Sequence, residues 1–224
     1  MQFNELINIL RKNNSYEEFD KAFRQISFLE LETLECIPQN PIYHPEGNVF
    51  IHSLLSLVRA KQLSNDERVW FAALVHDLGK AATNKDMWPK QYNHEALGVP
   101  IINALCDRIC APVDYVKIAI AATREHLNIH RFFQLRSIKK LALLQRMWGL
   151  TRDDLQCIVL TAKADAQGRG PLFVEKPYPQ AEAVLEAYDI VQSVQQKMIR
   201  VYQNFERECL RQLDERYPRQ AGGY

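Results

Sequence analysis

The stretch Val69-Trp-Phe-Ala-Ala-Leu-Val-His-Asp-Leu-Gly-Lys80 decides how this chain is interpreted. Apolar residues occupy every position from Val69 to Val75, which indicates a helix that is buried on all sides. A buried helix that ends in His76-Asp77 places two ionisable groups away from water. A carboxylate there needs a cation, strong hydrogen bonds or a metal ion. Lys80 is expected on the same side of the chain, within reach of an anion bound to that ion.

Two other predicted helices end in the same way. The apolar stripe of a helix over 153–166 leads to Asp165, and the stripe of a helix over 113–126 leads to His126, both with the spacing i, i+3, i+7, i+10. Three separate helices thus each deliver a residue of metal-ligand type at the carboxyl end of an apolar face. This combination favours a metal centre over ordinary structural use of the same residues.

The remaining histidines support this hypothesis. All six histidines of the chain lie between His44 and His130. Among them, His52 lies near the start of one predicted helix and His94 near the start of another, so both can add imidazoles to the same centre.

The apolar pattern is helical along nearly the whole chain, because runs of strict alternation are missing and the chain has only 8 glycines. It predicts an all-α fold in one compact domain. We expect the helix that carries His76 to begin with a capping box from Ser64 to Glu67 and to stop at Gly79. We also expect a kink or break at Gly98 and Pro100. The expected helices cover residues 4–10, 16–28, 48–61, 64–79, 93–110, 113–126, 137–147, 153–166 and 180–213.

Composition excludes several classes of protein. The 224 residues include 28 Lys+Arg and 27 Asp+Glu, with 47% hydrophobic and 25% charged residues, as in an average soluble globular domain. No apolar run approaches the roughly 18 residues of a membrane span. Five cysteines without a CxxC pair favour a reducing compartment, so we expect a cytoplasmic protein. A net charge of +1 argues against a strongly basic nucleic-acid binder and leaves room for a local basic groove.

His52, His76-Asp77 and Asp165 together resemble the H…HD…D signature of the HD-domain metal-dependent phosphohydrolases. The resemblance is closest to the C-terminal HD domain of bacterial tRNA nucleotidyltransferases (CCA-adding enzymes) and covers about residues 41–195. It implies an HD-domain helical bundle, preceded by an N-terminal helical extension over 1–40 and followed by a long C-terminal helix and tail over 196–224. The stretches that carry it are Tyr43 to His52, Phe71 to Lys80, Asn93 to Glu95, Ala164 to Arg169 and Pro177 to Ala181.

The polymerase head of the CCA-adding enzymes has no counterpart in the chain. Only about 40 residues precede the HD region, so we expect the hydrolase module standing alone, without nucleotide addition. The resemblance implies 2',3'-cyclic phosphodiesterase, 2'-nucleotidase or phosphatase activity on phosphoesters of nucleotides or RNA ends.

The resemblance also assigns roles to residues. His52, His76, Asp77 and Asp165 match the metal ligands, and His94 and His126 match positions that hold a second metal or surround the first. Asp77 and Lys80 are the expected catalytic residues: Asp77 as a ligand that orients the attacking water, and Lys80 as a cation that stabilises charge on the phosphoryl group. Imidazole and carboxylate ligands do not select among Ni, Mn, Mg, Co, Fe and Zn, so the metal is expected only to be a divalent ion.

Basic residues near the ligand segments are candidates for phosphate or RNA-end binding. They are His130, Arg131, Arg136 and Arg169. The sequence also departs from the resemblance at two positions. Glu125 stands where close relatives often have a second adjacent histidine, and Arg146 stands where an acidic residue is common.

Other functions remain open at this stage. One alternative is a phosphohydrolase of free mononucleotides, and another is a non-catalytic module that binds a nucleotide or an RNA end. A role in conflict between phage and host cannot be separated from RNA repair by sequence. We expect no membrane partner, and a homodimer through the C-terminal helix is a further expectation.

Overall fold

The computed structural model describes residues 1–26, 28–197 and 202–220. Within these residues helices joined by turns and loops form the molecule, and the one β-type pairing is an isolated bridge between Pro38 and Asn48. The predicted all-α fold is confirmed. None of the described helices is long and apolar enough to cross a lipid bilayer.

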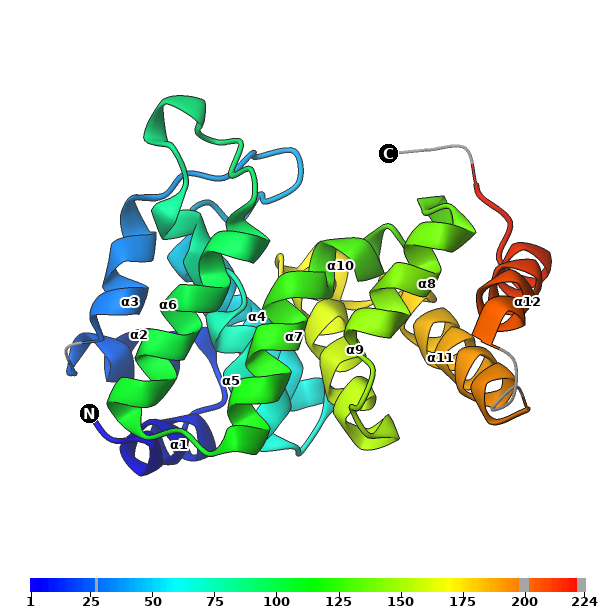
Figure 1. Ribbon diagram of the computed structural model, residues 1–224. Helices are drawn as coiled ribbons and strands as arrows, with labels where there is room; N and C mark the ends of the chain where they lie inside the picture. Colours follow the sequence, from blue (N-terminus) through cyan, green and yellow to red (C-terminus); the bar gives the residue numbers. More distant parts are fainter. Residues whose placement is uncertain (27, 198–201, 221–224) are drawn as a thin grey trace.

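Figure 1 shows how the helices are arranged. They are α1 (Phe3–Lys12), α2 (Tyr16–Arg24), α3 (Leu29–Glu32), α4 (Val49–Leu63), α5 (Glu67–Val75), α6 (His94–Ile109), α7 (Val113–His130), α8 (Ser137–Arg146), α9 (Arg152–Gln167), α10 (Pro171–Val174), α11 (Gln180–Lys197) and α12 (Tyr202–Arg216). Shorter 3-10 turns are η1 (Thr33–Cys36), η2 (Leu78–Ala82), η3 (Lys85–Met87) and η4 (Phe132–Gln134).

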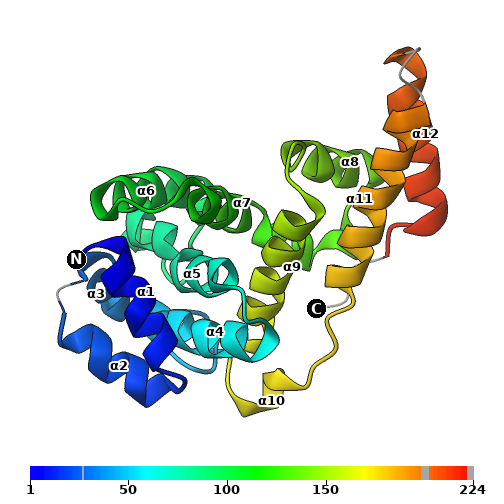
Figure 2. The same ribbon diagram turned by 90° about the horizontal axis from the view of Figure 1, so that it is seen from below.

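Helix α5 forms the centre of the bundle. Helices α4, α7 and α9 pack around it (Figure 2). Every side chain from Val69 to Val75 is buried, as the continuous apolar run predicts. Burying one large apolar side chain contributes about 1.5–3 kcal/mol, so this run is a main source of the stability of the bundle. The carboxyl end of α5, where His76 and Asp77 follow, is therefore held by three neighbouring helices.

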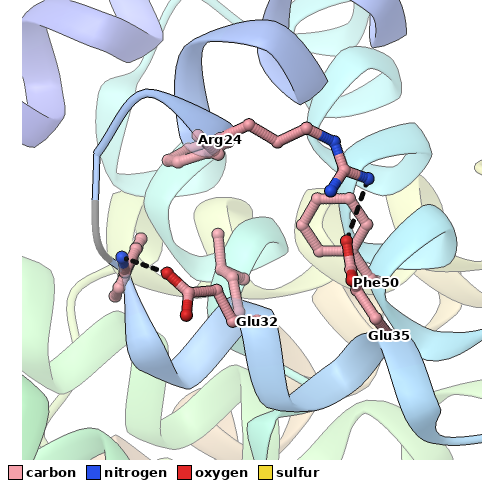
Figure 3. Close-up of a pocket in the computed structure, with 7 residues that line it drawn as sticks. Arg24, Glu32, Glu35 and Phe50 are labelled. Carbon is pink, nitrogen blue, oxygen red and sulfur yellow. Dashed lines mark hydrogen bonds and ion pairs between the residues drawn. The ribbon is translucent and has the colours of Figure 1, made fainter.

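The amino-terminal helices α1, α2 and α3 cover one side of this bundle. Phe3 of α1 packs edge to face against Phe71 of α5, with ring centroids 5.8 Å apart. A cavity of about 230 Å³ lies between α2, α3, η1 and α4. Figure 3 shows Arg24 over the ring of Phe50 and paired with Glu35 beside this cavity. The cavity contains no histidine and is separate from the residues that the sequence singled out.

The prediction of one long C-terminal helix is wrong. The chain forms two helices, α11 and α12, which pack against each other and against α8 (Figure 2). Cys209 and Leu213 of α12 are fully buried in this arrangement, whereas one straight helix would leave that apolar face in water. Lys140 of α8 is also buried, and its ammonium donates to the carbonyl of Tyr217.

Two smaller predictions, the cap and the end of α5, are wrong, and α6 does not break at Gly98 or Pro100. Ser64 does not cap α5; its hydroxyl accepts from the amide of Asp66, and Asp66 is the cap because its carboxylate accepts from the amide of Arg68. Helix α5 ends at Val75, before the turn η2. Pro100 lies within a continuous α6, because it is exposed and water can satisfy the carbonyl oxygen that its missing N–H leaves without a partner.

Candidate metal centre

Two glycines let the turn after α5 approach α6 closely. A Cβ atom on Gly79 would lie 1.9 Å from the carbonyl oxygen of His94 and 2.5 Å from the amide nitrogen of Gly98. Only a residue without a side chain fits at this contact. The contact places Asp77, two residues before Gly79, beside the first turn of α6.

A third glycine, Gly168, allows a similarly close contact between backbones at the end of α9. A Cβ atom on Gly168 would lie 2.6 Å from the Cα atom of Ser56 on α4. The backbone of α9 therefore touches that of α4 one turn after Asp165. This close approach allows Asp165 to reach His52.

The first group of ligand atoms comes from His52, His76 and Asp165, which are all buried. His52 Nε2 lies 3.0 Å from Asp165 Oδ1, and His76 Nε2 lies 3.8 Å from Asp165 Oδ2. The two imidazole rings meet edge to face, with centroids 5.6 Å apart. Three segments that are distant in the sequence thus converge, as the apolar stripes predict.

Asp77, the fourth predicted ligand, lies between this group and a second one. Its Oδ2 is 3.4 Å from His76 Nε2 and 3.7 Å from His52 Nε2. Its Oδ1 is 3.4 Å from His94 Nε2 and 3.9 Å from His126 Nε2. The two carboxylate oxygens therefore face two different pairs of histidines, and Asp77, His94 and His126 form the second group of ligand atoms.

Hydrogen bonds fix the tautomer of three of these histidines. Nδ1 of His76, His94 and His126 each donates, at 2.8 Å, to the carbonyl of the residue three positions earlier. In the neutral ring the proton is then on Nδ1, and Nε2 presents a lone pair to the centre. Burial lowers the pKa of His76 and, more strongly, that of His126, which keeps both rings neutral at pH 7.

The inward nitrogens lack partners that would satisfy them. His94 Nε2 and His126 Nε2 are 3.2 Å apart, so two lone pairs face each other. His76 Nε2 and Asp77 Oδ1 are buried and have no hydrogen-bond partner among the described residues. A cation between these atoms resolves the repulsion, and neutral imidazoles with carboxylates are the donor set that divalent transition metals prefer. The residues present therefore fit a divalent metal ion.

Both aspartates are held in the ionised form. Burial alone would raise the pKa of Asp77, but Lys80 and the histidines around it bring this pKa well below its usual range. His130 and other neighbours outweigh burial in the same way and lower the pKa of Asp165. The ammonium of Lys80 is itself buried, 2.6 Å from Asp77 Oδ2 and 2.7 Å from Gln39 Oε1.

Two predicted phosphate-binding residues contact a ligand directly. His130 Nε2 lies 2.6 Å from Asp165 Oδ2, and His130 Nδ1 lies 2.7 Å from the hydroxyl of Tyr178. Burial raises the pKa of Tyr178 well above its usual value, so the hydroxyl keeps its proton and can donate it to Nδ1. Arg169 lies 3.2 Å from Asp165 Oδ1 and also donates to the carbonyl of Tyr43.

Arg131 and Arg136 lie at the exposed ends of α7 and α8. Among the described residues, no hydrogen bond or ion pair joins either guanidinium to the centre. Their role in phosphate binding stays a prediction.

The two departures from the family pattern contact each other. Arg146 binds the buried carboxylate of Glu125 through two hydrogen bonds, of 2.6 and 2.8 Å. Glu125 also accepts from Asn128 at 2.9 Å. Because Glu125 directly precedes His126, this ion pair helps to hold the end of α7 against α8.

Sequence reasoning missed three residues that support the centre. They are Gln39, which accepts from Lys80; Glu46, which lies 2.7 Å from His52; and Tyr178, which bonds to His130. Glu46 and Tyr178 lie within stretches that resemble the family, but neither follows an apolar stripe. Residues in loops carry no periodicity that would indicate the direction of their side chains.

A comparison with family models identifies the domain. The model of the HD domain matches residues 49–162, about half of the chain, and this range contains every histidine of the two ligand groups. The chain belongs to the HD domain family. The match includes α4, α5, α6 and α7 and most of α9, the helices that surround the centre.

Relatives of this HD domain chain extend beyond the matched range. It is 41% identical over 169 residues to the Multifunctional CCA protein of Hahella chejuensis, 75% of this chain and 40% of that protein. It is 42% identical over 170 residues to the Multifunctional CCA protein of Teredinibacter turnerae, and 42% identical over 169 residues to that of Methylococcus capsulatus. The chain thus spans about two fifths of the length of these relatives.

Proposed function

We propose that this chain is a divalent-metal-dependent phosphohydrolase that acts on phosphoesters of nucleotides or RNA ends. The observation that carries the proposal is the set of buried ligand atoms that converge around Asp77, among which His76 Nε2 and Asp77 Oδ1 have no hydrogen-bond partner among the described residues. The similarity to proteins named Multifunctional CCA protein supports an RNA end, or a nucleotide with the same phosphoester, as the class of substrate.

The residues divide into two sets of ligands. His52, His76, Asp77 and Asp165 would hold a first ion, and Asp77 would share its second oxygen with a further ion at His94 and His126. A divalent ion at this place supplies Lewis acidity: it neutralises phosphate oxygens and lowers the pKa of water.

The chain's own residues then act on the substrate. When only the first ion is bound, the oxygen of Asp77 that faces His94 and His126 would be free to accept a hydrogen bond from the attacking water and so orient it. Lys80 keeps Asp77 ionised. Its ammonium also provides a positive charge next to the place where we expect the phosphoryl group to bind. His130 can donate from Nε2 to a phosphate oxygen when it leaves Asp165, while the hydroxyl of Tyr178 satisfies Nδ1.

Basic residues at the ends of α7 and α8 complete the proposed substrate site. Arg131 and Arg136 are exposed and follow the helix that carries His126 and His130. We propose that they attract a phosphate or an RNA end and thereby provide the local basic rim of a nearly neutral protein.

The experiment is a screen of metals against substrates. Purified protein is stripped of metal, supplied in turn with Ni, Mn, Mg, Co, Fe or Zn, and assayed with 2',3'-cyclic nucleotides, RNA with a cyclic phosphate end, 2'-phosphates and a generic phosphatase substrate. We expect hydrolysis that needs metal and is lost in Asp77→Ala. Metal-independent hydrolysis, or unchanged hydrolysis by the variant, would refute the proposal.

The same screen separates the alternatives. Activity on free mononucleotides and none on cyclic phosphate ends would identify a mononucleotide phosphohydrolase. Metal binding without hydrolysis of any substrate would indicate a binding module. The intact set of ligands favours the enzyme over the binding module, because a module that only binds would be expected to have lost ligands, whereas His52, His76, Asp77 and Asp165 are all present.

A further inference from the structure

The loop over residues 38–48 lies against the centre and is itself well fixed. We name it the entry loop; it connects η1 to α4. The bridge between Pro38 and Asn48 closes it at its base, and the amide of Val49 donates to the carbonyl of Ile37 at 3.2 Å. Within the loop the carbonyl of Asn40 accepts from two following amides. The position of its side chains is thus set by backbone contacts.

Glu46 of the entry loop is buried beside the ligand His52. Its Oε1 lies 2.7 Å from His52 Nδ1 and 2.9 Å from His44 Nδ1. On the other side of the ring, His52 Nε2 lies 3.0 Å from Asp165. The ring of His44 packs edge to face on that of His52, with centroids 4.7 Å apart. The orientation of His52 is therefore defined by the carboxylates of Glu46 and Asp165 and by ring contacts with His44 and His76.

His52 differs from the other ligand histidines in the group that faces its Nδ1. The rings of His76, His94 and His126 donate to the carbonyl of the residue three positions earlier. For His52 the equivalent carbonyl belongs to Val49 and accepts from the hydroxyl of Ser53 at 2.9 Å. The carboxylate of Glu46 lies 2.7 Å from Nδ1 instead, in an ion-pair contact that small rotations of the two side chains turn into a hydrogen bond. A carboxylate forms a stronger, charge-assisted bond than a carbonyl and makes the opposite ring nitrogen a better electron donor.

Gln39 of the same loop contacts the other functional group of the centre. Its Oε1 accepts from the ammonium of Lys80 at 2.7 Å, and its Nε2 donates to the carbonyl of Asn48 at 3.3 Å. Gln39 and Lys80 are both buried. The ammonium of Lys80 also forms an ion pair with Asp77, at 2.6 Å. Gln39 thus fixes the direction from which the ammonium approaches Asp77.

We propose that the entry loop positions the catalytic centre: Glu46 orients the metal ligand His52, and Gln39 orients Lys80. The inference rests on the proposed function, because it assumes that the centre holds a divalent ion. It assigns different consequences to the two residues. Loss of Glu46 weakens metal binding, whereas loss of Gln39 leaves metal binding intact and slows the chemical step.

The first test measures metal affinity without any substrate. Co²⁺ is titrated into metal-free protein against a coloured chelator, and the visible spectrum of bound Co²⁺ reports its coordination. We expect Glu46→Ala to weaken Co²⁺ binding by about 10- to 100-fold, as for other residues that orient a metal ligand. Glu46→Gln keeps an acceptor oxygen for Nδ1 and should recover most of the affinity. Glu67→Ala is the matched control, since Glu67 pairs with Arg11 and Tyr115 away from the centre.

The second test separates Gln39 from Glu46. Gln39→Ala should bind Co²⁺ within about twofold of the wild type, a difference too small to indicate a lost ligand contact. Its kcat for phosphoester hydrolysis should fall while KM is unchanged, and Gln39→Glu, which keeps an oxygen for Lys80, should restore much of kcat. Circular dichroism confirms that each variant is folded.

The outcomes distinguish this inference from the proposed function. If the wild type binds no divalent ion, the proposed function fails. If it binds Co²⁺ and Glu46→Ala binds equally well with the same spectrum, the positioning role of Glu46 is wrong while the proposed function stands. A loss of Co²⁺ affinity in Gln39→Ala as large as that in Glu46→Ala would overturn the division of roles.

Discussion

Replacing Asp77 with asparagine tests the centre through stability as well as activity. In the metal-free protein the change removes the charged partner of Lys80, whose ammonium is buried and keeps only Gln39. A hydrogen bond to a charged group contributes about 1.5–3 kcal/mol. For a domain of this size 1 kcal/mol corresponds to about 2–4 °C, so a loss of about 2 kcal/mol lowers Tm by about 4–8 °C.

Metal binding adds a second, larger difference between the stabilities of the wild type and Asp77→Asn. An ion at about 100 times its Kd stabilises the wild type by about 2.7 kcal/mol, or about 5–10 °C. Asp77→Asn lacks the carboxylate that both ligand groups share, so its Tm should barely change when metal is added. The assay is thermal unfolding of both proteins with chelator and with excess Mn²⁺ or Ni²⁺.

The control is Asp189→Asn, because Asp189 pairs with Arg152 in an ion pair that is about half exposed. Exposed pairs contribute about 0–1 kcal/mol, so this variant should follow the wild type in every condition. Equal stabilisation of wild type and Asp77→Asn by metal would refute the assignment of Asp77 as a ligand. A wild type that no divalent ion stabilises would refute the metal centre itself.

Three further predictions use the surroundings of the centre. Arg146→Ala leaves the buried carboxylate of Glu125 without its cation, and urea unfolding should show a loss of about 1–3 kcal/mol. Burial lowers the pKa of His44 to about 4 in the folded protein. As pH falls below about 6.5, His44 therefore binds a proton in the unfolded chain before it does so in the folded protein. In the metal-free protein His44 alone should then account for a loss of up to about 1.4 kcal/mol per pH unit between about pH 6.5 and 4, and His44→Asn should lose less stability than the wild type by that amount in the same urea titrations. Tyr178→Phe removes the hydroxyl that bonds to His130, and steady-state assays should show a several-fold slower reaction while the free energy of unfolding changes by about 1 kcal/mol.

Helical periodicity explains what could be predicted from sequence. Asp165 and His126 continue apolar stripes, so their direction toward the core follows from geometry alone, and the structure places both at the centre. His76 follows the continuous apolar run of α5, which predicts that it is buried, whereas His52 lies near the start of its helix and is indicated as a ligand by the family resemblance. The break between α11 and α12 could not be found, because the apolar pattern of both helices has the same period and the packing of one on the other is a tertiary effect.

The loop residues that support the centre could not be predicted from the sequence. Nothing in the order of residues indicates that Glu46 is buried, since a carboxylate in a loop with proline and glycine is usually exposed. Its burial depends on the histidines that surround it, which are 2 and 6 residues away in the chain and meet it only after folding. Tyr178 likewise meets His130 across 48 residues.

Helix α7 sets the distance between the two halves of the centre. His126 and His130 lie one turn apart on it; the first faces Asp77 and the second binds Asp165. Four residues of α-helix advance about 6 Å, a length that hydrogen bonds within the helix hold nearly constant. The helix therefore holds at a fixed spacing the two histidines that contact the two acidic groups. An ion of a different size is therefore expected to be accommodated by rotation of side chains or by shifts of the segments that carry Asp77 and Asp165, while the spacing of His126 and His130 stays the same.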